Sequence, residues 1–203
     1  MAIAQDPVTL IAQAALPTRH GEFEVGIFHV EGVQNEALAV MRGQLDAPSP
    51  PLVRLHSECL TGDVLGSLRC DCGEQLDASL ALMAQEPHAV LLYLRQEGRG
   101  IGLANKIRAY ALQDRGLDTV DANLALGLPV DRREYHSAAA ILHHLGARRV
   151  RLLTNNPTKQ QSLEEHGVEV VERVPLEMPP NEVNHDYLRT KAHRMGHLLA
   201  FER

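Results

Sequence analysis

The sequence predicts an α/β fold: a three-layer α/β/α arrangement around a mixed β-sheet, with an N-terminal antiparallel extension. Segments with strand and helix periodicity alternate from Leu52 onward, which is typical of this class. The unbroken apolar run Ala89–Leu94 predicts a strand that is buried on both faces. Near the N-terminus, Phe23, Val25 and Ile27 recur at every second position, which predicts a strand of the extension.

The first half of the chain is expected to contain this extension and the first long helix. Residues 1–15 are expected to form a loose arm with a helix-like patch at Val8–Ala15. The proline-rich stretch Asp46–Pro51 predicts a turn. Further elements are expected at 23–28, 38–41 and 52–56 as strands, and at 73–85 as a helix.

In the second half, helices are expected at 101–114, 135–145, 158–166 and 183–199, and strands at 150–154 and 168–174. Residues 116–130 look irregular because two glycines and a proline interrupt the pattern. Asp131 with Glu134 fits a capping box, which would make Asp131 a helix cap and Arg133 a surface arginine. Thr158 with Gln161 fits a second capping box. No linker marks a second domain, so a single domain is predicted over residues 1–203.

The composition limits the classes of function. Apolar residues make up 44% of the 203 residues and aromatic residues only 3%, so an aliphatic core is expected. The net charge of -6 argues against a nucleic-acid binder, whereas a small polyanionic substrate needs only a local basic pocket. No basic leader and no run of eighteen apolar residues is found, so neither a signal peptide nor a membrane span is expected. Three cysteines without an export signal favour a cytoplasmic location.

The three cysteines, Cys59, Cys70 and Cys72, are close in sequence. On an extended segment the thiols of Cys70 and Cys72 would point to one side, and a turn at 61–63 would return Cys59 to the same point. Three thiols without a fourth cysteine suggest a zinc ion with one position open for water. A disulfide would leave one thiol over. A structural zinc with His56 as the fourth ligand stays open on spacing alone.

Two strand-to-helix junctions have the composition of phosphate-binding loops. The segment Arg95–Lys106 contains alternate glycines, which allow close approach of a ligand, and Arg99 could add a bidentate contact. A tight turn is the alternative interpretation. At the second junction, Thr154 and Lys159 could bind phosphate oxygens. The position of Tyr110 within the helix expected at 101–114 favours, on its own, a half-buried packing role.

Together these segments resemble the GTP cyclohydrolase II family, which opens riboflavin biosynthesis in bacteria and plants. The resemblance extends from about Leu16 to Leu199. The motifs that carry it are His56–Asp63, Leu68–Gly73, Arg95–Leu103, Lys106–Asp114 and Arg151–Lys159.

The resemblance implies a zinc-dependent hydrolase that converts GTP and water to 2,5-diamino-6-(5-phospho-ribosylamino)pyrimidin-4(3H)-one, formate and pyrophosphate. It implies one zinc per chain, bound by Cys59, Cys70 and Cys72. The implied substrate contacts are Arg54, Leu55, His56, Ser57, Glu58, Gln75, Glu97, Gly98, Arg99, Thr119, Thr154 and Lys159. The implied catalytic residues are Asp131 as proton acceptor, Arg133 as nucleophile on the α-phosphate, and Tyr110 near the guanine ring.

The chemistry of these residues qualifies two of the implied roles. A guanidinium has a pKa above about 12, so electrostatic stabilisation of the transferring phosphorus by Arg133 is an equal hypothesis. Three thiolates leave a zinc site with net negative charge, so Tyr110 or a nearby carboxylate is expected to assist proton transfer. Magnesium is expected to bridge the substrate phosphates, with Arg99 and Lys159 offsetting their charge.

The resemblance also implies a homodimer of the stand-alone form, without the extra domain that makes the four-carbon unit in bifunctional relatives. Two alternatives stay open. One is a paralogue that stops at the formamide product, against which Tyr110 weighs. The other is a non-catalytic nucleotide-binding module with structural zinc, against which the intact Asp131 and Arg133 weigh.

Overall fold

The computed structural model describes residues 6–199 and divides into two compact units. The first, here called the sheet unit, holds the chain through His56, Asp77–Arg95 and Glu134–Leu176. The second, here called the cysteine unit, holds Ser57–Leu76, Gln96–Arg133 and the chain from Glu177 onward. The single domain predicted over residues 1–203 stays a prediction.

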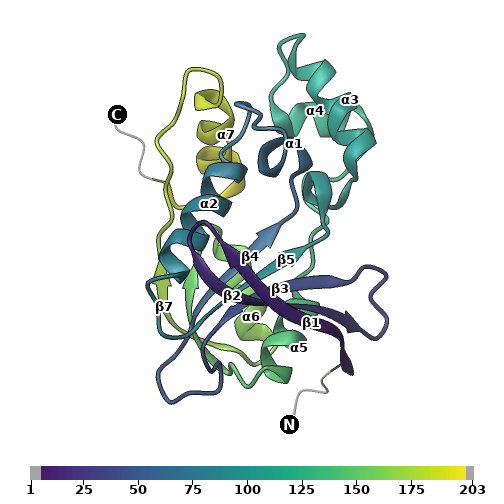
Figure 1. Ribbon diagram of the computed structural model, residues 1–203. Helices are drawn as coiled ribbons and strands as arrows, with labels where there is room; N and C mark the ends of the chain where they lie inside the picture. The colour runs from purple at the N-terminus through teal and green to yellow at the C-terminus, as the bar shows by residue number, and fades with distance from the viewer. Residues whose placement is uncertain (1–5, 200–203) are drawn as a thin grey trace. The chain divides into compact units, whose positions relative to one another are not determined.

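The sheet unit is built on a seven-stranded mixed sheet in the order β1-β2-β3-β5-β4-β6-β7 (Figure 1). The neighbours β1 and β2, β2 and β3, and β3 and β5 pair antiparallel, whereas β4, β6 and β7 run parallel. The predicted mixed sheet and its antiparallel extension are therefore confirmed. The strands are β1 (Val8–Thr18), β2 (Gly21–Val30), β3 (Ala37–Arg42), β4 (Leu52–Ser57), β5 (Ala89–Leu94), β6 (Arg149–Leu153) and β7 (Glu169–Val174).

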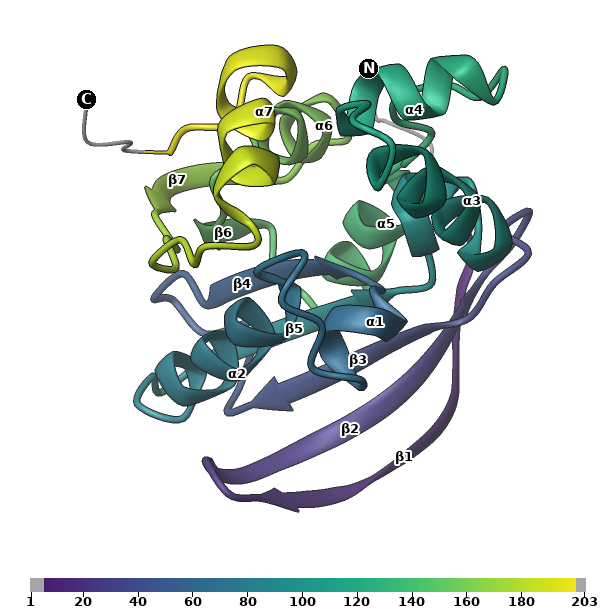
Figure 2. The same ribbon diagram turned by 90° about the horizontal axis from the view of Figure 1, so that it is seen from above.

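The central strand β5 is buried on both faces, as its unbroken apolar run predicts. Val90 and Leu92 belong to the same core cluster as Ile141 of α5 (His136–His144) and Leu163 of α6 (Pro157–Glu165). Leu91 is equally buried but lies outside that cluster, as expected for the opposite face of the strand. Figures 1 and 2 show α2 (Cys72–Met83) on one side of the sheet and α5 and α6 on the other. The core is aliphatic, as the composition indicates.

The prediction of a helix-like patch at Val8–Ala15 is wrong, because this segment belongs to strand β1. Thr18 and Gly21 close a tight turn, and the backbone of β1 then pairs with β2 along its length. Pairing with a neighbouring strand supplies the backbone hydrogen bonds, so it overrides a weak local helix pattern.

The prediction that residues 116–130 are irregular is also partly wrong, because this segment contains α4 (Thr119–Ala125). Asp118 caps this helix, since its carboxylate accepts hydrogen bonds from the backbone N–H groups of Val120 and Asp121. The other helices of the cysteine unit are α1 (Leu60–Asp63), the 3₁₀ turn η1 (Glu97–Gly100), α3 (Leu103–Gln113) and α7 (His185–Met195). No helix within residues 6–199 is both long and apolar enough to cross a membrane.

Neither predicted capping box forms. Helix α5 begins after Tyr135, so Asp131 is not its cap. Helix α6 is capped by Asn156, whose side chain accepts from the N–H of Thr158, and Pro157 occupies the first helical turn. The turn expected at 61–63 is instead the short helix α1.

Candidate functional site

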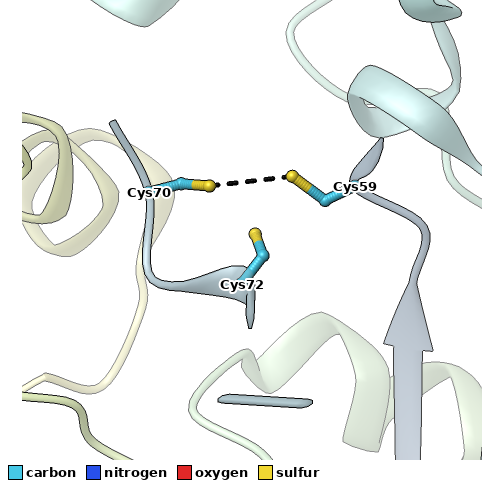
Figure 3. Close-up of side chains that lie close together, drawn as sticks. All are labelled: Cys59, Cys70 and Cys72. Carbon is cyan, nitrogen blue, oxygen red and sulfur yellow. Dashed lines mark hydrogen bonds between the residues drawn. The ribbon is translucent and has the colours of Figure 1, made fainter. Parts of the chain in front are cut away.

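The three cysteine sulfurs converge within the cysteine unit (Figure 3). Cys59 immediately precedes α1, Cys70 lies in the following loop, and Cys72 is the first residue of α2. Their Sγ atoms all lie within 4.8 Å of one another, and those of Cys59 and Cys70 are 3.6 Å apart. A tetrahedral zinc with Zn–S bonds of about 2.3 Å separates two sulfur ligands by about 3.8 Å. The convergence predicted from the sequence is confirmed, although the segment with Cys70 and Cys72 is a loop and helix start rather than an extended strand.

Two glycines make room for this cluster. A Cβ atom on Gly62 would lie 2.8 Å from the Sγ of Cys70 and 3.2 Å from the Sγ of Cys59. A Cβ atom on Gly73 would lie 2.3 Å from the carbonyl oxygen of Gly62. The thiols therefore pack against bare backbone, and any larger residue at position 62 would force them apart.

The electrostatics of the cluster favour a bound cation. Hydrogen bonds from Cys70 and Cys72, with Lys106 adding its charge, hold the pKa of Cys59 far below its usual range. The same hydrogen bond to Cys59 raises the pKa of Cys70 to about 11, and the pKa of Cys72 also lies well above its usual value. The three sulfurs cannot all be ionised at this separation without a compensating positive charge. A soft divalent cation such as zinc suits these ligands.

A lysine and a glutamate surround the sulfur of Cys59. The Nζ atom of Lys106 lies 3.1 Å from the Sγ of Cys59 and 2.8 Å from Oε1 of Glu97. Glu97 also accepts hydrogen bonds from the backbone N–H groups of Leu60 and Gly98. Burial lowers the pKa of Lys106, but Glu97 and Cys59 more than offset this, so the lysine is held protonated. The cysteine cluster and the start of η1 are thereby tied together.

His56, considered above as a fourth zinc ligand, is not in the group of described residues that could hold a metal. Its imidazole belongs to the sheet unit, where it stacks on Tyr93 with ring centroids 5.4 Å apart. Within residues 6–199 the group that could hold a metal therefore consists of the three thiols, a donor set that would leave one position of a tetrahedral zinc for another ligand.

Tyr110 lies on α3 close to the cluster. Its hydroxyl is 3.5 Å from the Oγ1 of Thr61, which is in turn 3.7 Å from the Sγ of Cys59. Burial raises the pKa of Tyr110 to about 12, so the phenol keeps its proton at neutral pH. Tyr110 is therefore suited to donate a proton rather than to accept one.

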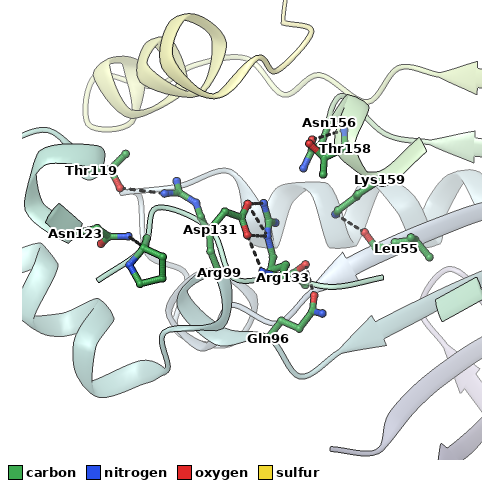
Figure 4. Close-up of polar contacts among 12 residues, drawn as sticks. Leu55, Gln96, Arg99, Thr119, Asn123, Asp131, Arg133, Asn156, Thr158 and Lys159 are labelled. Atoms are coloured by element: carbon green, nitrogen blue, oxygen red, sulfur yellow. Dashed lines mark hydrogen bonds and ion pairs between the residues drawn. The ribbon is translucent and has the colours of Figure 1, made fainter. Parts of the chain in front are cut away.

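The glycine-rich segment forms a strained turn. Gly98 and Gly100 have positive φ, and Arg99 between them has φ 60, the only such non-glycine residue within 6–199. The carbonyl of Arg99 accepts a hydrogen bond from the N–H of Arg132, which fixes this conformation. The guanidinium of Arg99 lies 3.5 Å from the hydroxyl of Thr119 (Figure 4). Two of the predicted substrate contacts thus lie together.

Asp131 and Arg133 form a bidentate ion pair (Figure 4). The Nε atom of Arg133 lies 2.9 Å from one carboxylate oxygen of Asp131, and the backbone N–H of Arg133 donates to the same oxygen. Burial raises the pKa of Asp131, but Arg133 lowers it by more, so the carboxyl stays ionised. The Arg133 side chain is only 10% exposed, so the expectation of a surface arginine is wrong.

Five predicted substrate contacts lie in the sheet unit, and several of them bind its backbone. Lys159 donates to the carbonyl of Leu55 at 2.7 Å (Figure 4), and Arg54 donates to the carbonyl of Leu153 at 3.1 Å. The Oγ1 of Thr154 accepts from the N–H of Asn156. His56 is described above.

The remaining predicted contacts lie in the cysteine unit. Ser57 donates to the side chain of Gln96 at 3.3 Å, and Gln75 donates to Asp71. Glu58 is partly exposed. The thiols, Tyr110, Glu97, Arg99, Thr119 and the Asp131–Arg133 pair therefore all belong to the cysteine unit.

Sequence reasoning missed Lys106 and the buried Asp71–Lys191 ion pair as parts of this unit. A signal for Lys106 existed, since it is the last residue of the glycine-rich segment and the first of a motif that carries the resemblance. No local pattern points to Lys191, which is 120 residues from Asp71.

The profile of the family described as GTP cyclohydrolase II matches residues 9–175. The chain belongs to the GTP cyclohydrolase II family. The sequence-based prediction of the family is confirmed. GTP cyclohydrolase-2 of Hahella chejuensis is 55% identical over 192 residues, which cover 95% of this chain and 93% of that protein. GTP cyclohydrolase-2 of Picrophilus torridus is 50% identical over 195 residues, 95% of this chain and all of that protein.

A longer relative also matches. Riboflavin biosynthesis protein RibBA of Salinispora tropica is 56% identical over 193 residues, and the chain spans about half of its length, 48%. Among solved structures, RibBX of A. baumannii, a two-domain 3,4-dihydroxy-2-butanone 4-phosphate synthase, has a TM-score of 0.52 at 19% identity. The match covers 87% of this chain and 42% of RibBX, and it supports the α/β fold alone.

The packing at Gly62 predicts that Gly62→Ala weakens metal binding. The new methyl group would displace the sulfurs of Cys70 and Cys59, so we expect zinc affinity to fall at least about 10-fold. Zinc content and competition with a chromophoric chelator measure the change. Gly66→Asn is the matched control, because Gly66 faces open space and asparagine tolerates its positive φ. Equal zinc affinity of Gly62→Ala and the wild type would contradict the packing argument.

Proposed function

We propose that the protein is a zinc-dependent GTP cyclohydrolase II, which converts GTP and water to 2,5-diamino-6-(5-phospho-ribosylamino)pyrimidin-4(3H)-one, formate and pyrophosphate. The observation that carries the proposal is the convergence of three sulfurs beside a protonated tyrosine, in a chain that belongs to this family. Ring opening at C8 of guanine needs water activation and proton transfer, which such a site supplies.

The residues proposed to hold the zinc are Cys59, Cys70 and Cys72. When bound, zinc would act as a Lewis acid that lowers the pKa of a coordinated water molecule to near neutrality. Lys106 lies beside Cys59 and offsets part of the thiolate charge. Glu97 holds Lys106 in this position through their 2.8 Å contact.

Arg99 in the cysteine unit and, separately, Thr154 and Lys159 in the sheet unit are retained as proposed contacts of the substrate phosphates. When bound, Mg²⁺ would offset part of the phosphate charge. Support for Arg99 comes from its constrained turn and its contact with Thr119. The remaining substrate contacts named in the sequence analysis are retained as proposals, as are the homodimer and the cytoplasmic location.

Arg133 is proposed to stabilise the transferring phosphorus electrostatically. Its guanidinium is held by two carboxylate oxygens of Asp131, which orients it and keeps it charged. This arrangement suits a fixed positive charge better than a nucleophile, because a protonated guanidinium has no free lone pair.

The proposed activity predicts formate and pyrophosphate from GTP in a metal-dependent assay. We expect both products in equal amounts with zinc and magnesium present, and loss of formate after removal of zinc with a chelator. Formate and pyrophosphate are measured separately by coupled enzymatic assays. A paralogue that stops at the formamide would release pyrophosphate only, and a non-catalytic binding module would release neither.

The position of Tyr110 predicts that Tyr110→Phe stalls the second hydration. Loss of the phenol proton removes a general acid, which typically contributes 10²-fold or more, so we expect formate release to fall by at least about 100-fold. Pyrophosphate release should persist, and a formamide intermediate should accumulate by mass spectrometry. A wild-type formate yield from Tyr110→Phe would show that the tyrosine has another role.

The Asp131–Arg133 pair predicts that no covalent nucleotide adduct forms on the protein. Rapid quenching of the enzyme with radiolabelled GTP should leave the protein unlabelled, while Arg133→Ala should lower pyrophosphate release by about 10³-fold or more. Detection of a phosphoguanidino adduct on Arg133 would establish the nucleophile instead.

A further inference from the structure

The C-terminal helix α7 lies beyond residue 175, where the match to the family profile ends. It belongs to the cysteine unit and packs against α4. Leu188 is buried, and Gly196 ends the helix in a left-handed conformation. The helix is therefore an integral part of this unit.

The first contact of α7 with the candidate site is a buried ion pair. The Nζ atom of Lys191 lies 2.9 Å from Oδ1 of Asp71, and the two side chains are 11% and 2% exposed. Asp71 stands between the proposed zinc ligands Cys70 and Cys72. A buried carboxylate requires a partner, so the conformation of this loop depends on α7.

The second contact involves Tyr187, one turn before Lys191. Its hydroxyl accepts a hydrogen bond from Arg99 at 3.4 Å, and its ring centroid lies 4.6 Å from the Nζ atom of Lys191. One helical face thus contacts both the loop that carries two thiols and the arginine proposed for phosphate binding. Arg194 pairs in addition with Asp118, the cap of the helix that contains Thr119.

We propose that α7 is a positioning helix for the metal and the phosphate groups: Lys191 fixes the Cys70–Cys72 loop through Asp71, and Tyr187 orients Arg99. The zinc part depends on the three-thiol metal site, and the phosphate part depends on the proposed function. A merely structural helix would instead affect overall stability without separating zinc affinity from nucleotide affinity.

Zinc affinity in a double-mutant cycle tests the first part. Each of Lys191→Met and Asp71→Asn leaves the other charge buried without its opposite charge, so we expect zinc affinity to fall about 10- to 100-fold. The double variant should recover part of this loss, because neither charge is then left alone. Competition of Zn²⁺ with a chromophoric chelator measures affinity, and circular dichroism checks folding.

Two further variants control the cycle. Arg189→Met changes an exposed residue on the same helix, whose guanidinium pairs with Asp186, and it should keep wild-type zinc affinity. Lys191→Arg keeps the charge and should retain most of the affinity. Zinc losses that simply add in the double variant, or wild-type affinity in both single variants, would overturn the role of Lys191.

GTP binding by isothermal titration calorimetry tests the second part. Tyr187→Phe removes the acceptor for Arg99, so we expect GTP to bind about 10-fold more weakly with unchanged zinc affinity. Unchanged GTP affinity in a protein that binds GTP would overturn the role of Tyr187. If the wild type binds zinc in the expected pattern but neither binds nor cleaves GTP, the proposed function fails while the role of Lys191 stands.

Discussion

The close approach of three cysteine sulfurs is the constraint on which the cysteine unit depends. The sulfurs of Cys59 and Cys70 are 3.6 Å apart, a separation at which two thiolates need positive charge nearby. Lys106 supplies one such charge at 3.1 Å from Cys59, and a divalent cation would supply the rest. The backbone adapts to the same constraint, since Gly62 leaves space that a side chain would fill.

Two buried ion pairs, Lys106–Glu97 and Lys191–Asp71, flank this cluster. Such pairs add little net stability, because the loss of hydration offsets much of their attraction. They do define geometry, since breaking either pair leaves a charge buried without its partner. We interpret both as devices that hold the loops around the thiols in one conformation, in the same way that the Arg132 N–H holds the strained turn at Arg99.

The sequence predicted those features that depend on local pattern. The apolar run of β5 and the strand-to-helix junctions gave the α/β class, and the cysteine spacing indicated the sulfur cluster. Strand β1 was misread because its pairing with β2 is a tertiary interaction that leaves little trace in residues 8–15. Helix α4 was not predicted, because the glycines and proline that flank it are typical of an irregular segment and α4 itself is short. Contacts such as Lys191 with Asp71 join residues far apart in the chain, so no local pattern could reveal them.

Each unit is assembled from three separate stretches of the chain, which alternate between the two units. No uninterrupted stretch of the chain therefore contains the whole of either unit, although the three cysteines themselves share the single stretch Ser57–Leu76. Truncation of the chain at either end would therefore remove part of one unit rather than a whole unit. The region that aligns with RibBA of Salinispora tropica covers 95% of this chain and so includes parts of both units, within a protein of which it makes up 48%.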